Sequence, residues 1–152
     1  GPDDQRLRER AATLGLLDGP EAPVRFLGAI YEEDIIAGWF LSADVFCYPA
    51  NVGLSLLHAF GYGLPAVTCD NFAAQNPEIE ALRPGENGAV YTEGSVTDLV
   101  RVLNDLFSDR ARLKAMSAAA HRTAIEEYSI EAMADGFVQA VNRCVRPSGG
   151  TT

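Results

Sequence analysis

The sequence predicts an α/β domain of the Rossmann-like, three-layer type, with a mainly parallel sheet and a helical C-terminal tail. Three observations support this class. Short apolar runs of strand length alternate with helical segments as far as residue 91, the order typical of strand–helix–strand units. From Ser95 onward only helical periodicity remains. The 152 residues, 47% of them hydrophobic, suit one domain with a single core.

The first third of the chain is expected to form a helix, a strand and a second helix. Asp3 and Asp4 can cap a helix over residues 5–14. A largely apolar run predicts a strand over residues 24–28. Acidic residues suit the first turn of a helix, so residues 32–43, which begin with two glutamates, are expected as the next helix.

The middle of the chain reads as a strand, a helix and a second strand. A continuous apolar run predicts a buried strand over residues 45–48. The helix that follows is expected over residues 53–62, because Gly63 stops it and Pro65 lies just beyond. Residues 66–69 are expected as the next strand.

The remaining elements are mostly helical. Asn76 and Pro77 are a typical start for one or two helical turns, and they are followed by a turn and a short strand at residues 89–91. Apolar periodicity then predicts three helices, at residues 96–107, 109–127 and 130–145. The domain is therefore expected to cover residues 1–145, and residues 146–152, which cannot bury themselves, are expected to be disordered.

Composition excludes several classes of partner. The formal net charge is −9, and Lys114 is the only lysine, which argues against nucleic acid or an anionic membrane surface as the main partner. Apolar runs are too short for a membrane span or a secretory leader. The three cysteines have no metal-ligand spacing, so no metal site is expected, and their odd number fits a reducing cytoplasm.

The most informative stretch is residues 44–69, a strand–helix–strand unit in which Gly53 opens the helix. A helix N-terminus has unpaired backbone N–H groups and a partial positive charge, so phosphate is a natural ligand there. In parallel sheets, ligands bind beyond the carboxyl ends of the strands, where residues 49–53 should lie. The sequence therefore predicts a phosphate-bearing small molecule.

Six short motifs occur in the order seen in the retaining GT-B glycosyltransferases of the group 1 type, which this chain resembles. The resemblance spans about residues 1–141. In chain order, the motifs are VRFLG at 24–28, ADVFCYP at 43–49, GLSLLHA at 53–59, GLPAV at 63–67, PE at 77–78 and GENG at 85–88.

The resemblance implies the C-terminal, donor-binding half of such an enzyme, truncated at its N-terminus and lacking the N-terminal acceptor domain. A hexosyltransferase of this kind, as used in polysaccharide biosynthesis, moves a sugar from a nucleoside diphosphate sugar to a hydroxyl acceptor with retention. It needs no metal or other cofactor. Any peripheral membrane contact would come through the missing half, and the piece alone is expected to be inactive.

The resemblance also implies donor-binding residues. The amides of Gly53 and Leu54 would meet the diphosphate, and Ser55 could add a hydroxyl. The nucleobase would lie against residues 28–30, ending at Ile30. The sugar and ribose would be lined by Asn51, His58, Asn71 and Glu78.

Each of these residues also has a purely structural interpretation. His58 can pack the helix on the sheet, contact the ribose or transfer a proton. Gly53 can allow close packing in place of phosphate binding. Asn51 can cap the helix, Asn71 can shape a turn, and Glu78 suits a helix start by the helix dipole alone.

Two positions depart from the family pattern. Ala50 and His58 stand where the family typically has two glutamates, although Asp70-Asn71 and Pro77-Glu78 fit a subset that has His at the second position. Two alternatives therefore remain open. The chain could be a non-catalytic glycosyltransferase-like binding module, or part of another GT-B enzyme such as a nucleotide-sugar epimerase or a phosphorylase.

Three structural expectations follow. No basic residue lies between Arg25 and Arg83, so donor binding by this piece alone should be weak. In the family, two strands lie between those at 24–28 and 45–48. Without them, these two strands should pair directly, or the open edge should pair with another chain in a dimer. The helix at 130–145 should expose apolar surface.

Overall fold

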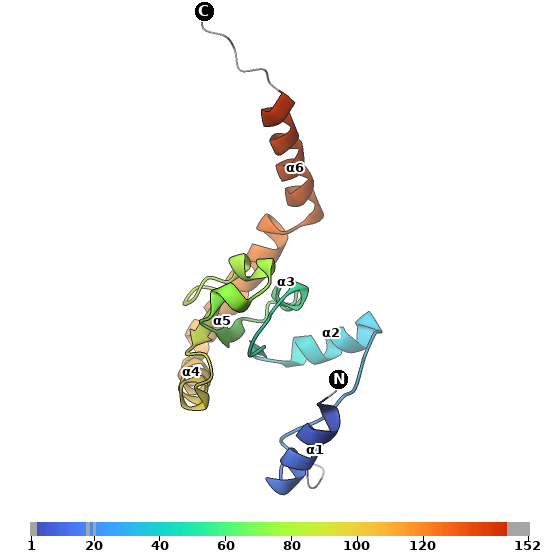
Figure 1. Cartoon of the computed structure of the whole chain (residues 1–152), viewed down its shortest axis with the longest axis vertical. Helices are drawn as coiled ribbons and strands as arrows, with labels where there is room; N and C mark the ends of the chain where they lie inside the picture. The colour runs from blue at the N-terminus through green and yellow to red at the C-terminus, as the bar shows by residue number, and fades with distance from the viewer. Residues whose placement is uncertain (1–2, 18, 20, 146–152) are drawn as a thin grey trace, which may run out of the picture. The chain divides into compact units, whose positions relative to one another are not determined.

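The computed structural model describes residues 3–17, 19 and 21–145, and the expected disordered tail lies outside this range. The chain divides into two compact units, Gly1–Ile36 and Ala37–Thr152 (Figure 1). Helix α2 (Glu33–Ser42) crosses the boundary between them and confirms the predicted helix to within one residue at each end.

The N-terminal unit contains helix α1 (Asp4–Thr13), close to the predicted bounds. Asp3 occupies the N-cap position but makes no capping hydrogen bond. Its carboxylate accepts instead from Arg6 at 3.0 Å, and Asp4 accepts from Arg8 at 2.7 Å. Asp3 therefore stands at the predicted N-cap position without a capping bond, and both aspartates act through side-chain ion pairs.

The predicted strand at residues 24–28 is also wrong, because this segment has no strand structure in the described part of the chain. Val24 N donates to Leu16 O at 3.2 Å, which is a loop contact and not part of a ladder. The Arg8 guanidinium lies 4.5 Å from the centre of the Phe26 ring. An apolar run becomes a strand only where a neighbouring strand supplies ladder hydrogen bonds, and the described residues of the N-terminal unit include no strand.

The larger unit is built on a three-stranded parallel sheet in the order β1-β2-β3. Its strands are β1 (Phe46–Cys47), β2 (Ala66–Cys69) and β3 (Gly88–Tyr91). Ala66 lies opposite Phe46 on one side and Gly88 on the other. The parallel sheet is confirmed with three strands in place of four. Residues 24–28 and 45–48 belong to different units, so their direct pairing and the pairing of the open edge with a second chain both stay predictions.

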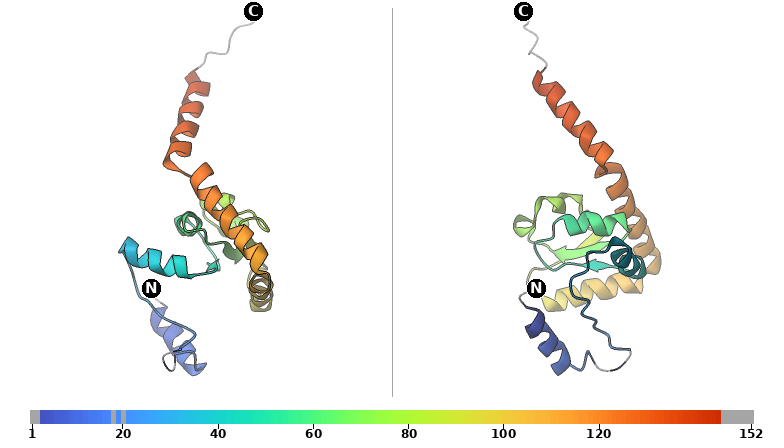
Figure 2. Two further views of the ribbon diagram at one scale, coloured as in Figure 1. Left: turned by 180° about the vertical axis from the view of Figure 1, so that it is seen from behind. Right: turned by 90° about the vertical axis from the view of Figure 1, so that its right-hand side faces the viewer.

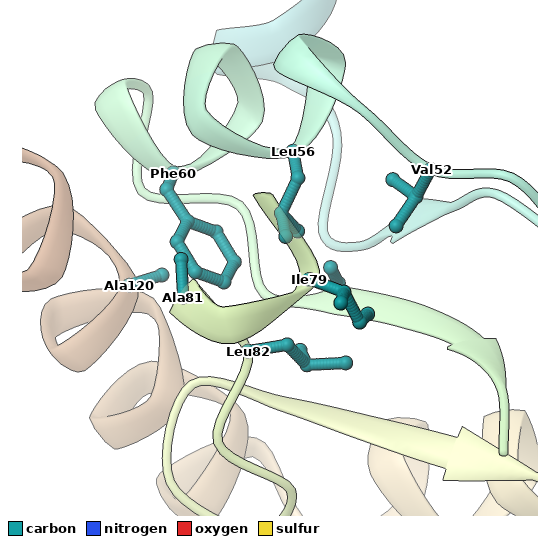
Figure 3. Packing of buried hydrophobic residues seen from close by; sticks show 8 residues of the cluster. Val52, Leu56, Phe60, Ile79, Ala81, Leu82 and Ala120 are labelled. Atoms are coloured by element: carbon teal, nitrogen blue, oxygen red, sulfur yellow. The ribbon is translucent and has the colours of Figure 1, made fainter. Parts of the chain in front are cut away.

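Two apolar clusters cover the opposite faces of β2, as side-chain alternation along a strand requires. Ala66 belongs to the cluster under helix α3 (Leu54–Gly61), which Figure 3 shows with Leu56 and Phe60 beside Ala81 and Leu82. Val67 and Cys69 belong to the other cluster, whose further members are Tyr91, Val102, Leu106, Leu113 and Met116.

Helix α4 (Val96–Ser108) and helix α5 (Arg110–Arg122) supply that second cluster. Seen from the side, the strands lie between α3 and α4 (Figure 2). This layering confirms the predicted three-layer α/β class. In the described part of the chain, no helix is both long enough and apolar enough to cross a membrane.

Between β2 and β3 the chain forms two short 3-10 helices, η1 (Phe72–Ala74) and η2 (Pro77–Ala81). The second was predicted as helical turns and begins at Pro77 as expected. Asn76 stands at its N-cap position but makes no capping hydrogen bond, since its side chain is bonded elsewhere.

The helix predicted over residues 109–127 ends earlier than expected. After α5 the chain widens into a π turn, η3 (Thr123–Glu127). The buried Thr123 hydroxyl donates to Ala119 O at 3.0 Å and accepts from Arg83 at 3.2 Å and Asn87 at 3.1 Å. Such side-chain insertions accompany local departures from α-helical geometry.

The last helix, α6 (Ile130–Val145), has no buried residue. Its exposed large apolar side chains recur at helical spacing and form one stripe, comprising Ile130, Met133, Phe137, Val138, Val141 and Val145. The expectation of exposed apolar surface on this helix is therefore confirmed.

The π turn is tied to the turn before β3 by a bidentate ion pair. Arg83 Nη1 donates to Glu127 Oε1 at 2.9 Å, and Nη2 donates to the other carboxylate oxygen. This pairing lowers the pKa of Glu127 below its usual 4.5 and raises the pKa of Arg83.

Because the pKa of Glu127 is lower in the folded state, its stabilising effect is present above the usual value and is lost as the pH falls through the lowered pKa. Glu127→Gln should therefore lower the urea midpoint at about pH 7, and the difference from the parent chain should shrink towards about pH 3. Glu126→Gln, at an exposed neighbouring position, is the control. An equal difference at both pH values would contradict the assignment.

Candidate functional site

The three parallel strands end at the same edge of the sheet, and a loop follows each of them. Residues 49–53 follow β1, Asp70 and Asn71 follow β2, and Thr92 and Glu93 follow β3. This is the edge where ligands of parallel α/β sheets bind. The sequence prediction that residues 49–53 lie there is confirmed.

The start of the first loop is held by β2 and β3. Pro49 O accepts from Cys69 N at 3.3 Å and from the Tyr91 hydroxyl at 3.1 Å. Burial raises the pKa of Tyr91 above its usual 10.0, so its hydroxyl remains protonated and stays a donor.

The rest of the loop is held by two residues that precede η2. Gln75 Oε1 accepts from Val52 N at 2.7 Å. Asn76 donates twice, from its backbone N to Val52 O at 3.2 Å and from Nδ2 to Asn51 O at 3.0 Å. The loop backbone is therefore fixed on both sides of Val52, which is itself only 1% exposed.

The N–H groups at the beginning of α3 remain open. Gly53 occupies the N-cap position, and its carbonyl accepts from Leu56 N at 2.8 Å. Within the described structure, no protein acceptor receives the amides of Gly53, Leu54 or Ser55. Leu54 is 73% exposed, so solvent reaches this end of the helix. The arrangement leaves unpaired donors and the positive end of the helix dipole available to an anion.

Gly53 also lies close to a neighbouring loop. A Cβ atom at this position would lie 3.3 Å from Asn76 Nδ2 and 3.7 Å from two further Asn76 side-chain atoms. A larger side chain would crowd Asn76 and the approach to the open amides. Close packing and anion binding are therefore compatible interpretations of this glycine.

Asn51 does not cap the helix, so this prediction is wrong. The N-cap is Gly53, no side-chain capping bond is present, and Asn51 lies two residues earlier with a positive φ of 55°. Asparagine tolerates this left-handed conformation better than most residues. The exposed side chain is left for other contacts, and its role toward the sugar stays a prediction.

His58 packs among aromatic rings. Its ring centre lies 5.2 Å from that of Phe40 and 5.4 Å from that of Tyr62. These contacts favour the packing interpretation, while ribose contact and proton transfer stay predictions.

Asn71 joins the ends of two strands. Its Nδ2 donates to both carboxylate oxygens of Glu93, at 3.1 and 3.0 Å, and Glu93 N donates to Asp70 Oδ1 at 2.9 Å. Glu93 was missed in the sequence, although its position directly after a predicted strand could have indicated it. Gln75 and Asn76 were also missed as loop contacts, and no local pattern signals their long-range bonds.

The remaining predicted site residues belong to three different segments of the chain. Ser55 is half-buried in the first turn of α3, and Glu78 is half-buried in the first turn of η2. Ile30 belongs to the N-terminal unit. The expected contacts of Ser55, Glu78 and Ile30 with a nucleotide-sugar donor stay predictions. Among the described residues, no group of three or more His, Cys, Asp or Glu side chains is placed to hold a metal ion.

Comparison with known proteins identifies the family. The family model described as "Glycosyl transferases group 1" matches residues 1–109. The chain belongs to this family. It is 30% identical over 139 residues to the D-inositol 3-phosphate glycosyltransferase of Rhodococcus opacus, covering 88% of this chain and 28% of that protein.

Solved structures agree on the fold. The C-terminal domain of the group 1 glycosyl transferase LpcC from Francisella tularensis superposes with a TM-score of 0.66 at 20% identity, over 83% of this chain and 62% of that one. Anabaena HepE, in complex with UDP and glucose, superposes with a TM-score of 0.72 at 19% identity. The match covers 91% of this chain and 36% of HepE. The chain thus has the fold of the C-terminal GT-B domain and spans about a third of HepE.

The Tyr91 contact with the loop can be tested by removing one oxygen atom. Tyr91→Phe should lower the free energy of unfolding by about 0.5–1.5 kcal/mol, the usual net worth of a hydrogen bond. The lower part of this range is expected, because Pro49 O keeps its bond from Cys69 N. Urea denaturation checks this, with Tyr31→Phe at an exposed position as the control. A variant as stable as the parent would show that the hydroxyl does not hold the loop.

Proposed function

We propose that this glycosyltransferase-family chain is the donor-binding half of an enzyme that transfers a sugar from a nucleoside diphosphate sugar to a hydroxyl acceptor with retention. The observation that carries the proposal is the set of open amides at Gly53, Leu54 and Ser55, at the ligand-binding edge of the sheet. The complex of HepE with UDP and glucose supports a nucleoside diphosphate as the ligand class.

In this proposal, each open group has a role. The amides of Gly53 and Leu54, with the Ser55 hydroxyl, stabilise the negative charge that develops on the leaving diphosphate. Preorganised donors of this kind act without reorganisation at the moment of reaction. Asn51 and Glu78 contact the transferred sugar or the ribose. The acceptor site belongs to the part of the parent enzyme that this chain does not include.

The charges of the chain limit how tightly it can hold a donor alone. One helix N-terminus contributes only about 0.3–2 kcal/mol toward an anion. Between Arg25 and Arg83 the sequence has no basic residue. Arg83 itself is engaged with Glu127 and Thr123. Strong clamping of a diphosphate needs arginine or lysine, which the parent enzyme would supply from elsewhere.

A second candidate is a non-catalytic binding module of the same fold. The observation that favours it is Ala50, which cannot make the polar contacts of a glutamate. Sugar transfer by the parent protein would eliminate this candidate. Product analysis with and without an acceptor alcohol separates transfer from epimerisation, because an epimerase converts the donor with no acceptor present.

Donor affinity tests the charge argument. Titration of the chain with UDP-glucose, followed by amide chemical shifts, should give a dissociation constant of about 1 mM or weaker, since one helix N-terminus provides little binding energy. A value near about 1 μM would require about 8 kcal/mol of binding energy and would contradict the argument.

A bulky residue at the helix start tests the site itself. In the parent enzyme, Gly53→Val should reduce sugar transfer by at least about 100-fold, the scale observed when one donor to a developing oxyanion is lost. Gly61→Ala is the matched control, because a Cβ atom there meets nothing within 4 Å. Full transfer activity in the Gly53 variant would refute the proposed use of these amides.

A further inference from the structure

We infer that Gln75 and Asn76 are positioning residues that keep the N-terminus of α3 open for an anion. This inference rests on the proposed function, since it concerns the same amides. It adds two residues that the sequence did not indicate, and it assigns them a role other than ligand contact.

Gln75 links the end of β2 to the loop after β1. Its Oε1 accepts from Val52 N at 2.7 Å, and its Nε2 lies 3.2 Å from Thr68 Oγ1 and 3.3 Å from Cys69 Sγ. Val52, Thr68 and Cys69 are each 1% exposed. A buried N–H without a partner is costly, so Val52 depends on this side chain for its acceptor.

Asn76 holds the two carbonyls that precede the helix. It donates to Val52 O at 3.2 Å from its backbone and to Asn51 O at 3.0 Å from Nδ2. In one more turn of α-helix, Asn51 O would accept from Ser55 N and Val52 O would accept from Leu56 N, by the usual spacing of four residues.

These bonds hold the loop in a non-helical conformation, with Asn51 at a φ of 55° and Gly53 at a φ of −133°, so that the helix begins only after Gly53. Leu56 N bonds to Gly53 O at 2.8 Å instead of to Val52 O, and the Ser55 amide is left without a protein acceptor in the described structure. Gln75 fixes the same loop from its other side. Together the two residues prepare the anion site before the ligand arrives, so binding does not have to order the loop.

A merely structural role would predict a loss of stability alone, whereas positioning predicts a loss of anion affinity in a folded protein. The probe is inorganic pyrophosphate, titrated into the isotope-labelled chain while the amide signals of residues 53–55 are followed. The variants are Gln75→Met, which keeps the length but not the bonds, and Asn76→Ala. Gln139→Met and Asn104→Ala, at exposed helical positions, are matched controls.

The parent chain and both controls should show the same pyrophosphate dissociation constant. Both variants should remain folded by circular dichroism and bind at least about 5-fold more weakly, the scale expected when a loop must be ordered on binding. In the Gln75 variant, hydrogen exchange at the Val52 amide should become at least about 10-fold faster, because the amide loses its acceptor.

Folded variants that bind pyrophosphate as tightly as the parent chain would overturn the inference. If the Gln75 variant unfolds, the inference is tested with Asn76→Ala alone, because Asn76 is exposed and its replacement should leave the chain folded. If the parent amides do not respond to pyrophosphate at concentrations well beyond the millimolar range expected for this piece alone, the proposed use of these amides fails. Hydrogen exchange at Val52 and Ser55 then still decides the positioning, because unchanged rates in both variants would overturn it separately.

Discussion

The candidate site depends on hydrogen bonds that distant residues make to one short loop. Between Pro49 and Val52, four backbone groups receive partners from β2, β3 and the segment before η2. Each bond is worth little by itself, but leaving a buried group unpaired costs more. The loop is consequently fixed only when the whole sheet is assembled, and the open amides at Gly53 are a product of the tertiary structure.

The packing of the sheet also determines where this loop lies. β2 is buried on both faces, with Ala66 in one cluster and Val67 in the other, so its register leaves little freedom to slip. Because β1 and β3 both pair with β2 in parallel, their carboxyl ends meet at one edge. The core therefore determines the position of the binding edge, and two of its members, Tyr91 and Val52, also hold or form the loop there.

The periodic features of this fold could be predicted from the sequence. Apolar spacing located the helices and three of the four expected strands, and the order of the elements gave the parallel sheet. The segment at 24–28 failed because a strand requires a neighbour, which no local pattern contains. Asn51 failed as a cap because α3 begins at Leu54, which puts Gly53 at the N-cap position. Gln75 acts on Val52 across 23 residues in the sequence, a separation that single-sequence patterns do not encode.

Helix α6 has a thermodynamic consequence of its own. It has 16 residues, contains Gly136, and buries none of its side chains. A helix of this length without tertiary packing is marginal in water, since propagation barely repays the cost of nucleation. Its residues should therefore exchange between helix and coil, and fraying should start at the end farthest from η3. Packing of another surface against the apolar stripe would stabilise the helix, so helix content should rise as the stripe is covered. Far-ultraviolet ellipticity would then measure how fully it is covered.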